Sequence, residues 1–212
     1  VLYRSFVHLR CHSHYSLLDG TASIKKIVTR AKQLGMNALA LTDRGNMYGA
    51  LEFYRCCRDE GIKPIIGLDI DVALGSRLEH DNCSSDSGHS LTLLCQNAIG
   101  FHNLLKLVSA CSCNGYDSTP RIDKTLLSQY REGIVCLSGG VSSELNQVIL
   151  RQGQMDPDWS DALQVATWFH SVYGDHYFIE VTNSHLETQK QTLAGAVAVA
   201  QRLGLPIVAT HD

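Results

Sequence analysis

The stretch AKQLGMNALALTD, residues 31–43, shows the unit from which the fold of this chain can be predicted. A helical pattern ends at Gly35, and a short, almost entirely apolar run follows at once. Glycine just after the last helical residue is the usual helix stop, because it adopts the left-handed conformation without strain. A short apolar run after such a stop is typical of a strand buried on both faces. Residues 31–43 therefore predict a helix end followed by a buried strand.

The same unit recurs along the chain. Its further predicted helix stops are Gly61, Gly133, Gly174 and Gly204. The runs after them are IKPIIGLDI, IVCLSGG, DHYFIEV and LPIVATHD, and the opening FVHLR and the internal SLTLLC bring the candidate strands to seven. Amphipathic segments such as residues 23–34 lie between them. The alternation predicts an α/β fold with a parallel sheet, open or closed into a barrel, as a single domain over residues 1–212. The polar segment 75–88 is predicted to be a surface loop.

The composition is that of a globular protein without a general polyanion-binding surface. Apolar residues make up 44% of the chain, charged residues 18%, and the formal net charge is −3, so any DNA contact is predicted to be local or on regions outside this sequence. The eight cysteines are scattered and form no CxxC pair, which favours reduced thiols over a disulfide framework. The sequence shows neither a membrane-spanning apolar run nor the apolar part of a signal peptide. A soluble cytoplasmic protein is predicted.

Polar side chains follow the ends of several predicted strands. In β/α barrels the carboxyl ends of the strands carry the chemistry. Carboxylates and imidazoles that meet there are ligands for a divalent metal ion. We therefore predict a candidate metal site at these strand ends. The residues concerned are His12, His14, Asp43, Asp69, Asp71, Glu180, His211 and Asp212.

Each of these residues also has a simpler interpretation. Asp43 is equally well explained as the N-cap of a following helix. Asp69 and Asp71 can be solvated positions at a strand edge, and Glu180 can pair with a nearby base. The histidines that better fit surface or packing positions than ligand positions are His14, His89, His102 and His170.

Longer motifs connect the chain to a known family. HLRCHSHYSLLDG (residues 8–20), ALALTDRGNMYGALEFYRCC (38–57) and GIKPIIGLDIDVA (61–73) occur near the N-terminus, and LTLLCQNAIGFHNLLKLVS, GIVCLSGGVSSEL and GLPIVATHD follow. In this order and spacing they resemble the N-terminal PHP (polymerase and histidinol phosphatase) domain of bacterial DNA polymerase III alpha subunits. The resemblance covers nearly the whole chain. It implies a distorted seven-stranded, TIM-like β/α barrel.

The resemblance also implies a site. In family members with an intact site, a cluster of metal ions supports 3′–5′ exonuclease or related phosphoesterase chemistry. By position in the motifs, His12, Asp19 and Asp212 keep the family's ligands, and Asp69 replaces a glutamate. The substituted ligand positions are Arg10, Arg44, Ser90 and Gly140.

Two of these substitutions place a guanidinium at a ligand position. Arginine stays protonated and has no lone pair to give a metal ion. Arg10 and Arg44 can instead form ion pairs with nearby carboxylates. The candidate ion-pair partners are Asp19, Asp43, Asp69 and Asp212. We therefore predict a vestigial metal site in a structural domain.

The predicted partners follow from the family. The rest of the polymerase chain would hold the polymerase site and most of the DNA contacts of replication. A separate proofreading exonuclease subunit of the replisome would dock on this domain. Because the sequence stops inside the family's Asp-x-His motif, it is predicted to be a fragment of a longer chain.

Two alternatives remain from the sequence. The first is an active metal-dependent exonuclease or phosphoesterase with a Mn, Zn or Mg ion. The second is a histidinol-phosphatase-like enzyme acting on small phosphate esters. SGGVSSE lacks the lysine of a phosphate-binding loop, and no nucleophile–base pair supports covalent catalysis. The remaining candidate ligands of one ion are His12, Asp19, Asp43, Asp69, Glu180, His185 and Asp212.

Overall fold

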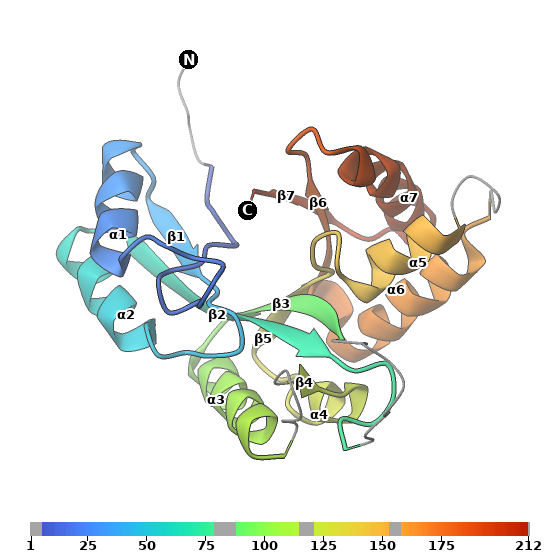
Figure 1. Cartoon of the computed structure of the whole chain (residues 1–212), viewed down its shortest axis with the longest axis horizontal. Helices are drawn as coiled ribbons and strands as arrows, with labels where there is room; N and C mark the ends of the chain where they lie inside the picture. The colour runs from blue at the N-terminus through green and yellow to red at the C-terminus, as the bar shows by residue number, and fades with distance from the viewer. Residues whose placement is uncertain (1–5, 79–87, 115–120, 153–157, 212) are drawn as a thin grey trace.

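The computed structural model describes residues 6–78, 88–114, 121–152 and 158–211. Its strands are β1 (Ala38–Leu41), β2 (Lys63–Val72), β3 (His89–Cys95), β4 (Arg121–Ile122), β5 (Ile134–Leu137), β6 (Tyr177–Thr182) and β7 (Ile207–Thr210). Its helices are α1 (Ile24–Gln33), α2 (Ala50–Asp59), α3 (Ala98–Asn114), α4 (Lys124–Gln129), α5 (Glu144–Gln152), α6 (Ser160–Tyr173), the short 3₁₀ helix η2 (Gly174–His176) and α7 (Glu187–Leu203). The helices surround the sheet, with α1 and α2 on one flank and α5, α6 and α7 on the other (Figure 1).

The strands form a curled sheet that makes a half-barrel. Its order is β1-β2-β3-β5-β6-β7, and β4 pairs with β2. The predicted α/β class with seven strands is confirmed. The prediction of a wholly parallel sheet is wrong at β3, which runs antiparallel to both β2 and β5. The sequence between β2 and β3 predicts a loop, and antiparallel neighbours need no crossover helix.

The predicted first strand, FVHLR, is an extended segment beside β1 and not a regular strand. The N–H of Ala40 donates to the carbonyl of His8 at 2.8 Å, and that of Thr42 to the carbonyl of Cys11 at 2.9 Å. The seventh strand is instead β4, which has two residues. A strand this short leaves no periodic pattern in the sequence.

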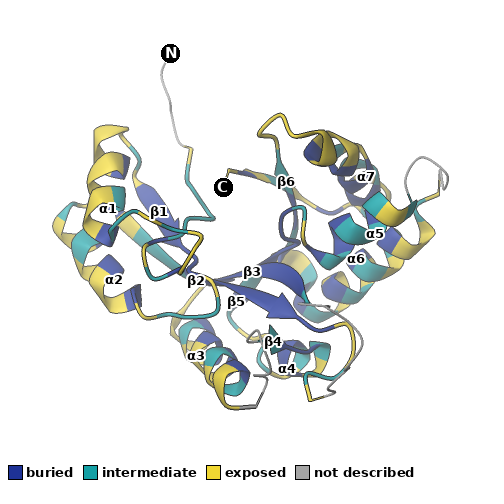
Figure 2. Cartoon of the chain, viewed as in Figure 1, coloured by how far each residue is buried: buried dark blue, intermediate teal, exposed yellow. Residues whose placement is uncertain are grey.

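Side-chain alternation along β2 separates the main core from the candidate site. Leu68, Ile70 and Val72 belong to the large core that side chains of α3, α4, α5, α6 and α7 complete. Asp69 and Asp71 point to the opposite face, because successive strand residues alternate. Both faces of β2 are buried over this stretch (Figure 2). The sheet therefore holds carboxylates inside the protein.

Four of the predicted helix stops, Gly35, Gly61, Gly174 and Gly204, directly follow the ends of helices and have positive φ. Gly133 also has positive φ, but it closes the turn before β5 instead of ending α4. The helix stops are therefore confirmed at four of the five positions.

Some sequence predictions lie outside the described residues: Cys83, most of the loop predicted at 75–88, and Asp212. The seven cysteines in the described ranges are free thiols. Burial raises the pKa of Cys57 and Cys111 to about 12. In the described ranges no helix is both long and apolar enough to cross a membrane.

Candidate functional site

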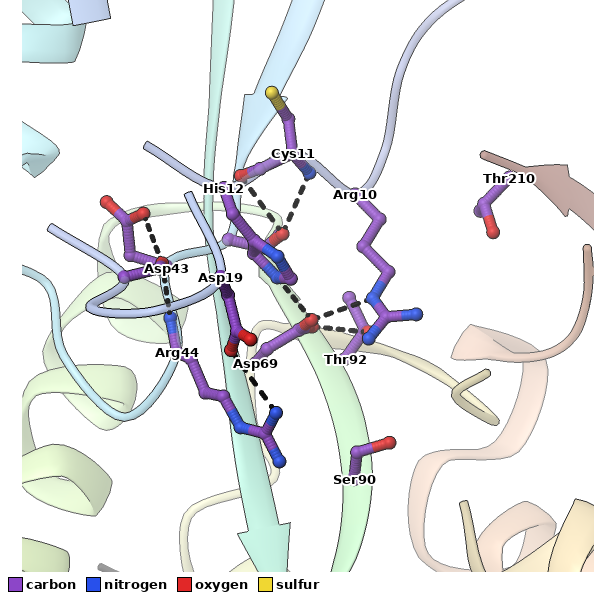
Figure 3. A network of polar contacts seen from close by, with 12 residues as sticks. Arg10, Cys11, His12, Asp19, Asp43, Arg44, Asp69, Ser90, Thr92 and Thr210 are labelled. Atoms are coloured by element: carbon purple, nitrogen blue, oxygen red, sulfur yellow. Dashed lines mark hydrogen bonds and ion pairs between the residues drawn. The ribbon is translucent and has the colours of Figure 1, made fainter. Parts of the chain in front are cut away.

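A buried carboxylate on β2, that of Asp69, lies at the centre of the candidate site (Figure 3). Asp69 is 2% exposed. Its Oδ2 accepts a hydrogen bond from Arg10 Nε at 2.7 Å and lies 2.7 Å from His12 Nε2. Its Oδ1 accepts from Thr92 Oγ1 at 2.5 Å. Arg10 and His12 come from the segment beside β1 and Thr92 from β3, so Asp69 ties three parts of the chain together.

The surroundings of Asp69 hold the pKa of its carboxyl below the usual value. Burial alone would raise that pKa. The hydrogen bond with His12, the charge of Arg10 and the Thr92 hydroxyl together outweigh burial. Asp69 is therefore an anion at neutral pH. Its bonds to charged donors belong to the stronger class of hydrogen bonds.

A second buried carboxylate, that of Asp43, anchors the loop after the N-terminal segment. Its Oδ1 accepts from the backbone N–H of Ser13 at 2.7 Å and from Ser16 Oγ at 2.6 Å. Its Oδ2 accepts from Ser13 Oγ at 2.8 Å. The N-cap of α2 is Gly49, so the alternative reading of Asp43 as a helix cap is wrong. This loop contact uses serines that the sequence reasoning did not single out.

Arg44 pairs with two carboxylates at the rim of the site. Arg44 Nη1 lies 3.3 Å from Asp19 Oδ2, and Nη2 lies 3.4 Å from Asp71 Oδ1. Burial raises the pKa of Asp71, and the charges of Asp69 and Asp19 add to this, while Arg44 opposes it. The predicted pairing of Arg44 with Asp19 is present, and Asp71 joins it as a partner that the prediction omitted.

The antiparallel pairing of β2 with β3 places polar residues side by side. Asp69 is opposite Thr92, and Asp71 is opposite Ser90. Ser90 Oγ lies 2.8 Å from Ser142 Oγ, in the loop before α5. Ser90, which the family resemblance predicts to be a substituted ligand position, thus bonds another hydroxyl. The alternation of Ser90 and Thr92 with leucines in SLTLLC indicated a polar face on β3. Only the strand register shows that this face meets Asp71 and Asp69.

Gly140 lies close to the guanidinium of Arg10. A Cβ built on Gly140 would lie 2.7 Å from Arg10 Nη1 and 3.8 Å from its Cζ. These distances show that the guanidinium fills the space that a side chain at position 140 would need. Arg10 and Gly140, two of the positions predicted to be substituted ligand positions, are therefore direct neighbours.

Glu180 lies on β6, and β3 and β5 stand between β2 and β6 in the order of the sheet. Its Oε1 accepts from Thr210 Oγ1 at 2.5 Å, and its backbone N–H donates to Ser138 Oγ at 2.9 Å. His185 is exposed on the turn after β6, with φ of 66°. Asp212 lies outside the described residues. Among the predicted ligands in the described residues, His12 contacts Asp69 directly, and Glu180 bonds Thr210.

The other histidines lie in varied environments. His14, His102 and His170 are exposed, and His89 is buried on β3. His211 is exposed near His8, whose pKa is lowered by burial and by His211. Over the described parts of the chain, no group of three or more His, Cys, Asp or Glu side chains is arranged to hold a metal ion.

Two cavities border the N-terminal segment. A cavity of about 520 Å³ opens beside the site, and its wall includes Arg10, His12, Asp19, Arg44 and His211. A cavity of about 720 Å³ has a mostly apolar wall that includes Leu9, Tyr54, Ile65, Phe101, Phe178 and Val208. Leu9 of the N-terminal segment lines the apolar cavity, whereas its neighbours His8 and Arg10 line the cavity beside the site.

Comparison with known proteins identifies relatives. The model of the PHP domain family matches residues 8–184. The DNA polymerase III subunit alpha of Treponema pallidum is 41% identical over 210 residues, which cover 98% of this chain and 18% of that protein. The same subunit of Deinococcus radiodurans is 38% identical over 99% of this chain and 16% of its own length. The chain thus spans less than a fifth of these relatives.

Solved structures share the fold at low sequence identity. A two-domain protein from Bacteroides vulgatus, described as containing a predicted PHP-like metal-dependent phosphoesterase, has a TM-score of 0.54 and 15% identity over 97% of this chain and 51% of its own. A proposed metal-dependent phosphoesterase from Bifidobacterium adolescentis has a TM-score of 0.53 and 13% identity over 96% of this chain and 85% of its own. These likenesses concern the fold alone.

Proposed function

The chain belongs to the PHP domain family, and we propose that it is the N-terminal PHP domain of a DNA polymerase III alpha-type chain in which ion pairs replace a metal cluster. The observation that carries this proposal is the 2.7 Å bond between Arg10 and the buried Asp69. A guanidinium has no lone pair to give a metal ion, and it adds positive charge where a metal would have to sit. The residues as arranged do not fit a metal cluster.

The other carboxylates support the same proposal. Both oxygens of Asp43 accept hydrogen bonds from the loop that contains Ser13 and Ser16. Asp19 and Asp71 share Arg44. A metal ion would have to displace these donors, and breaking a buried charged pair without a substitute is strongly unfavourable.

In the proposed whole protein, a cytoplasmic DNA-directed DNA polymerase, this domain has a structural role and docks a separate proofreading exonuclease subunit of the replisome. Analytical ultracentrifugation of the full-length chain with the purified exonuclease subunit of the same genome tests the docking. A complex is expected with the full-length chain and not with a polymerase-active chain that lacks residues 1–212. Equal binding by both chains would contradict the docking role.

The metal content of the protein tests the ion-pair proposal. The full-length chain, purified without chelator and without a histidine tag, is analysed for Mn, Zn, Fe and Mg by elemental mass spectrometry. We expect that this domain binds none of these metals. Asp69→Asn and His12→Ala should therefore leave the metal content of the full-length chain unchanged. Near-stoichiometric metal that disappears in both variants would overturn the proposal.

The second candidate function is a metal-dependent 3′–5′ exonuclease or phosphoesterase. The observation in its favour is that His12 remains beside Asp69, at 2.7 Å, on the wall of a cavity. This candidate predicts Mn-dependent release of nucleotides from a 3′ end, or turnover of a small phosphomonoester for a histidinol-phosphatase-like enzyme. Either activity has to disappear in His12→Ala to support it.

A further inference from the structure

We propose that the guanidinium of Arg10 is an intramolecular cation in a preformed pocket between Asp69 and Gly140, and that this pocket takes up a free guanidinium ion when Arg10 is shortened. The inference rests on the proposed replacement of the metal cluster by ion pairs. It assigns the pocket a chemical class of ligand: a planar, permanently charged organic cation.

One wall of the pocket is acidic and held in place independently of Arg10. Asp69 is 2% exposed, and its Oδ1 accepts from Thr92 Oγ1 at 2.5 Å. His12 Nε2 lies 2.7 Å from Oδ2. Two neighbours other than Arg10 therefore orient this carboxylate. Shortening Arg10 leaves a buried, oriented anion that lacks its permanent cation.

The opposite wall is the backbone at Gly140. Asn146 Nδ2 donates to the carbonyl of Gly140 at 2.9 Å, which holds this backbone in place. Within the described residues, the atoms close to a Cβ built on Gly140 are Nη1 of Arg10 at 2.7 Å and its Cζ at 3.8 Å. The space between Asp69 and Gly140 therefore has the size of the Arg10 guanidinium that fills it. A methyl group at position 140 would take up part of this space.

The chemistry of this space favours guanidinium over a metal ion. A guanidinium presents planar N–H donors that match the carboxylate geometry. It donates hydrogen bonds to a carboxylate, whereas a metal ion needs a full set of lone-pair donors around it. The Arg10 side chain is 10% exposed, so the guanidinium is largely shielded from water.

Hydrogen exchange in the full-length chain measures the occupancy of this pocket locally, at peptides that cover residues 8–20. Arg10→Ala is expected to speed exchange severalfold there, because the segment keeps its contact with Asp69 through His12 but loses the ion pair of Arg10. Guanidinium chloride at a few tens of millimolar, far below denaturing concentrations, is expected to slow exchange back toward the wild-type rate and to saturate. Sodium chloride at the same concentration is expected to have no such effect.

Gly140→Ala supplies the matched control. In Arg10→Ala/Gly140→Ala the new methyl group lies within 4 Å of no other described residue besides its chain neighbours, so it adds no clash to Arg10→Ala. It occupies the pocket and is expected to abolish the guanidinium effect. In the wild-type background the same Gly140→Ala change is expected to speed exchange at residues 8–20, because it pushes Arg10 away. This single variant tests the pocket if Arg10→Ala does not fold.

Three results would overturn the inference: equal rescue in the double variant, exchange in Arg10→Ala that matches the wild type without guanidinium, or failed rescue of Arg10→Ala by guanidinium. Domain-bound metal in the wild-type protein would overturn the proposed function as well. Failed rescue in a metal-free protein would overturn this inference alone, so the two failures are distinguishable.

Discussion

Asp43 is the residue on which the loop after the N-terminal segment depends most directly. It is 2% exposed and accepts three hydrogen bonds from Ser13 and Ser16. Ser16 Oγ in turn accepts from the backbone N–H of Arg44 at 3.0 Å. The loop that carries Asp19 is therefore held by one buried carboxylate. This makes Asp43 a structural residue in the arrangement described.

Asp43→Ala is expected to lower the free energy of unfolding by about 2–4 kcal/mol, because buried donors that lose their acceptor cost roughly 1–3 kcal/mol each. Urea unfolding at neutral pH, followed by circular dichroism, measures the change. The exposed Asp59→Ala on α2 is the matched control and should change stability by less than about 0.5 kcal/mol. A loss as small as that of the control would contradict the anchoring role of Asp43.

Among the elements, α4 begins at a cap that also ties down the chain after β2. Asp123, the N-cap, accepts from the backbone N–H of Leu126 at 3.0 Å and from Arg77 Nη1 at 2.9 Å. Burial raises the pKa of its carboxyl, but these hydrogen bonds and the charge of Arg77 outweigh burial, and the pKa is lowered. A single carboxylate thus joins the start of α4 to the turn after β2.

The pH dependence of this cap has a definite sign. A carboxyl whose pKa is lowered by folding contributes its full stability above its unfolded pKa of about 4 and loses it as the pH falls through the folded pKa. Asp123→Asn keeps a capping oxygen but removes the charge, and is expected to cost about 1 kcal/mol at pH 7. Unfolding curves from pH 7 to pH 2 should show this difference shrinking below about pH 4. A difference that stays constant with pH would contradict the role of the charge.

At the scale of the whole molecule, the curled sheet is open between β7 and the segment beside β1 (Figure 1). In the described residues β7 pairs with β6 alone, and Ile207 is 44% exposed. The apolar cavity of about 720 Å³ reaches both sides of this opening, at Leu9 and Val208. An apolar edge strand is usually covered by another element.

In a chain that extends beyond residue 212, as the much longer relatives do, we expect the remaining polypeptide to cover this edge. Hydrogen exchange at Ile207–Thr210 should then be about tenfold or more slower in the long chain than in residues 1–212 alone, since covered strands open rarely. Exchange at Ala38–Leu41, which already has neighbours on both sides, is the internal control. Equal exchange at Ile207–Thr210 in both chains would contradict this expectation.

The sequence by itself determined the fold class and the family. Helix stops such as Gly35 and Gly204, followed at once by buried strands, depend on local conformation and hydrophobicity, which act over a few residues. For the same reason α1, β1 and β2 were predictable. The motif around His12 and Asp19 identified the family, because long motifs retain residue types in order. The same motifs also indicated that Arg10 and Arg44 form ion pairs with carboxylates.

Only the tertiary structure decided the direction of β3, the pairing of Arg44 with Asp71, and the contact of Arg10 with Gly140. Each depends on segments that are distant in sequence, so neither periodicity nor spacing encodes it. The register that sets Asp69 opposite Thr92 belongs to the assembled sheet, since a shift by one residue would turn these side chains to the other face. The physical reason is that ion pairs and hydrogen bonds depend on distance in space and not on distance in sequence. Only folding brings these partners within hydrogen-bonding distance.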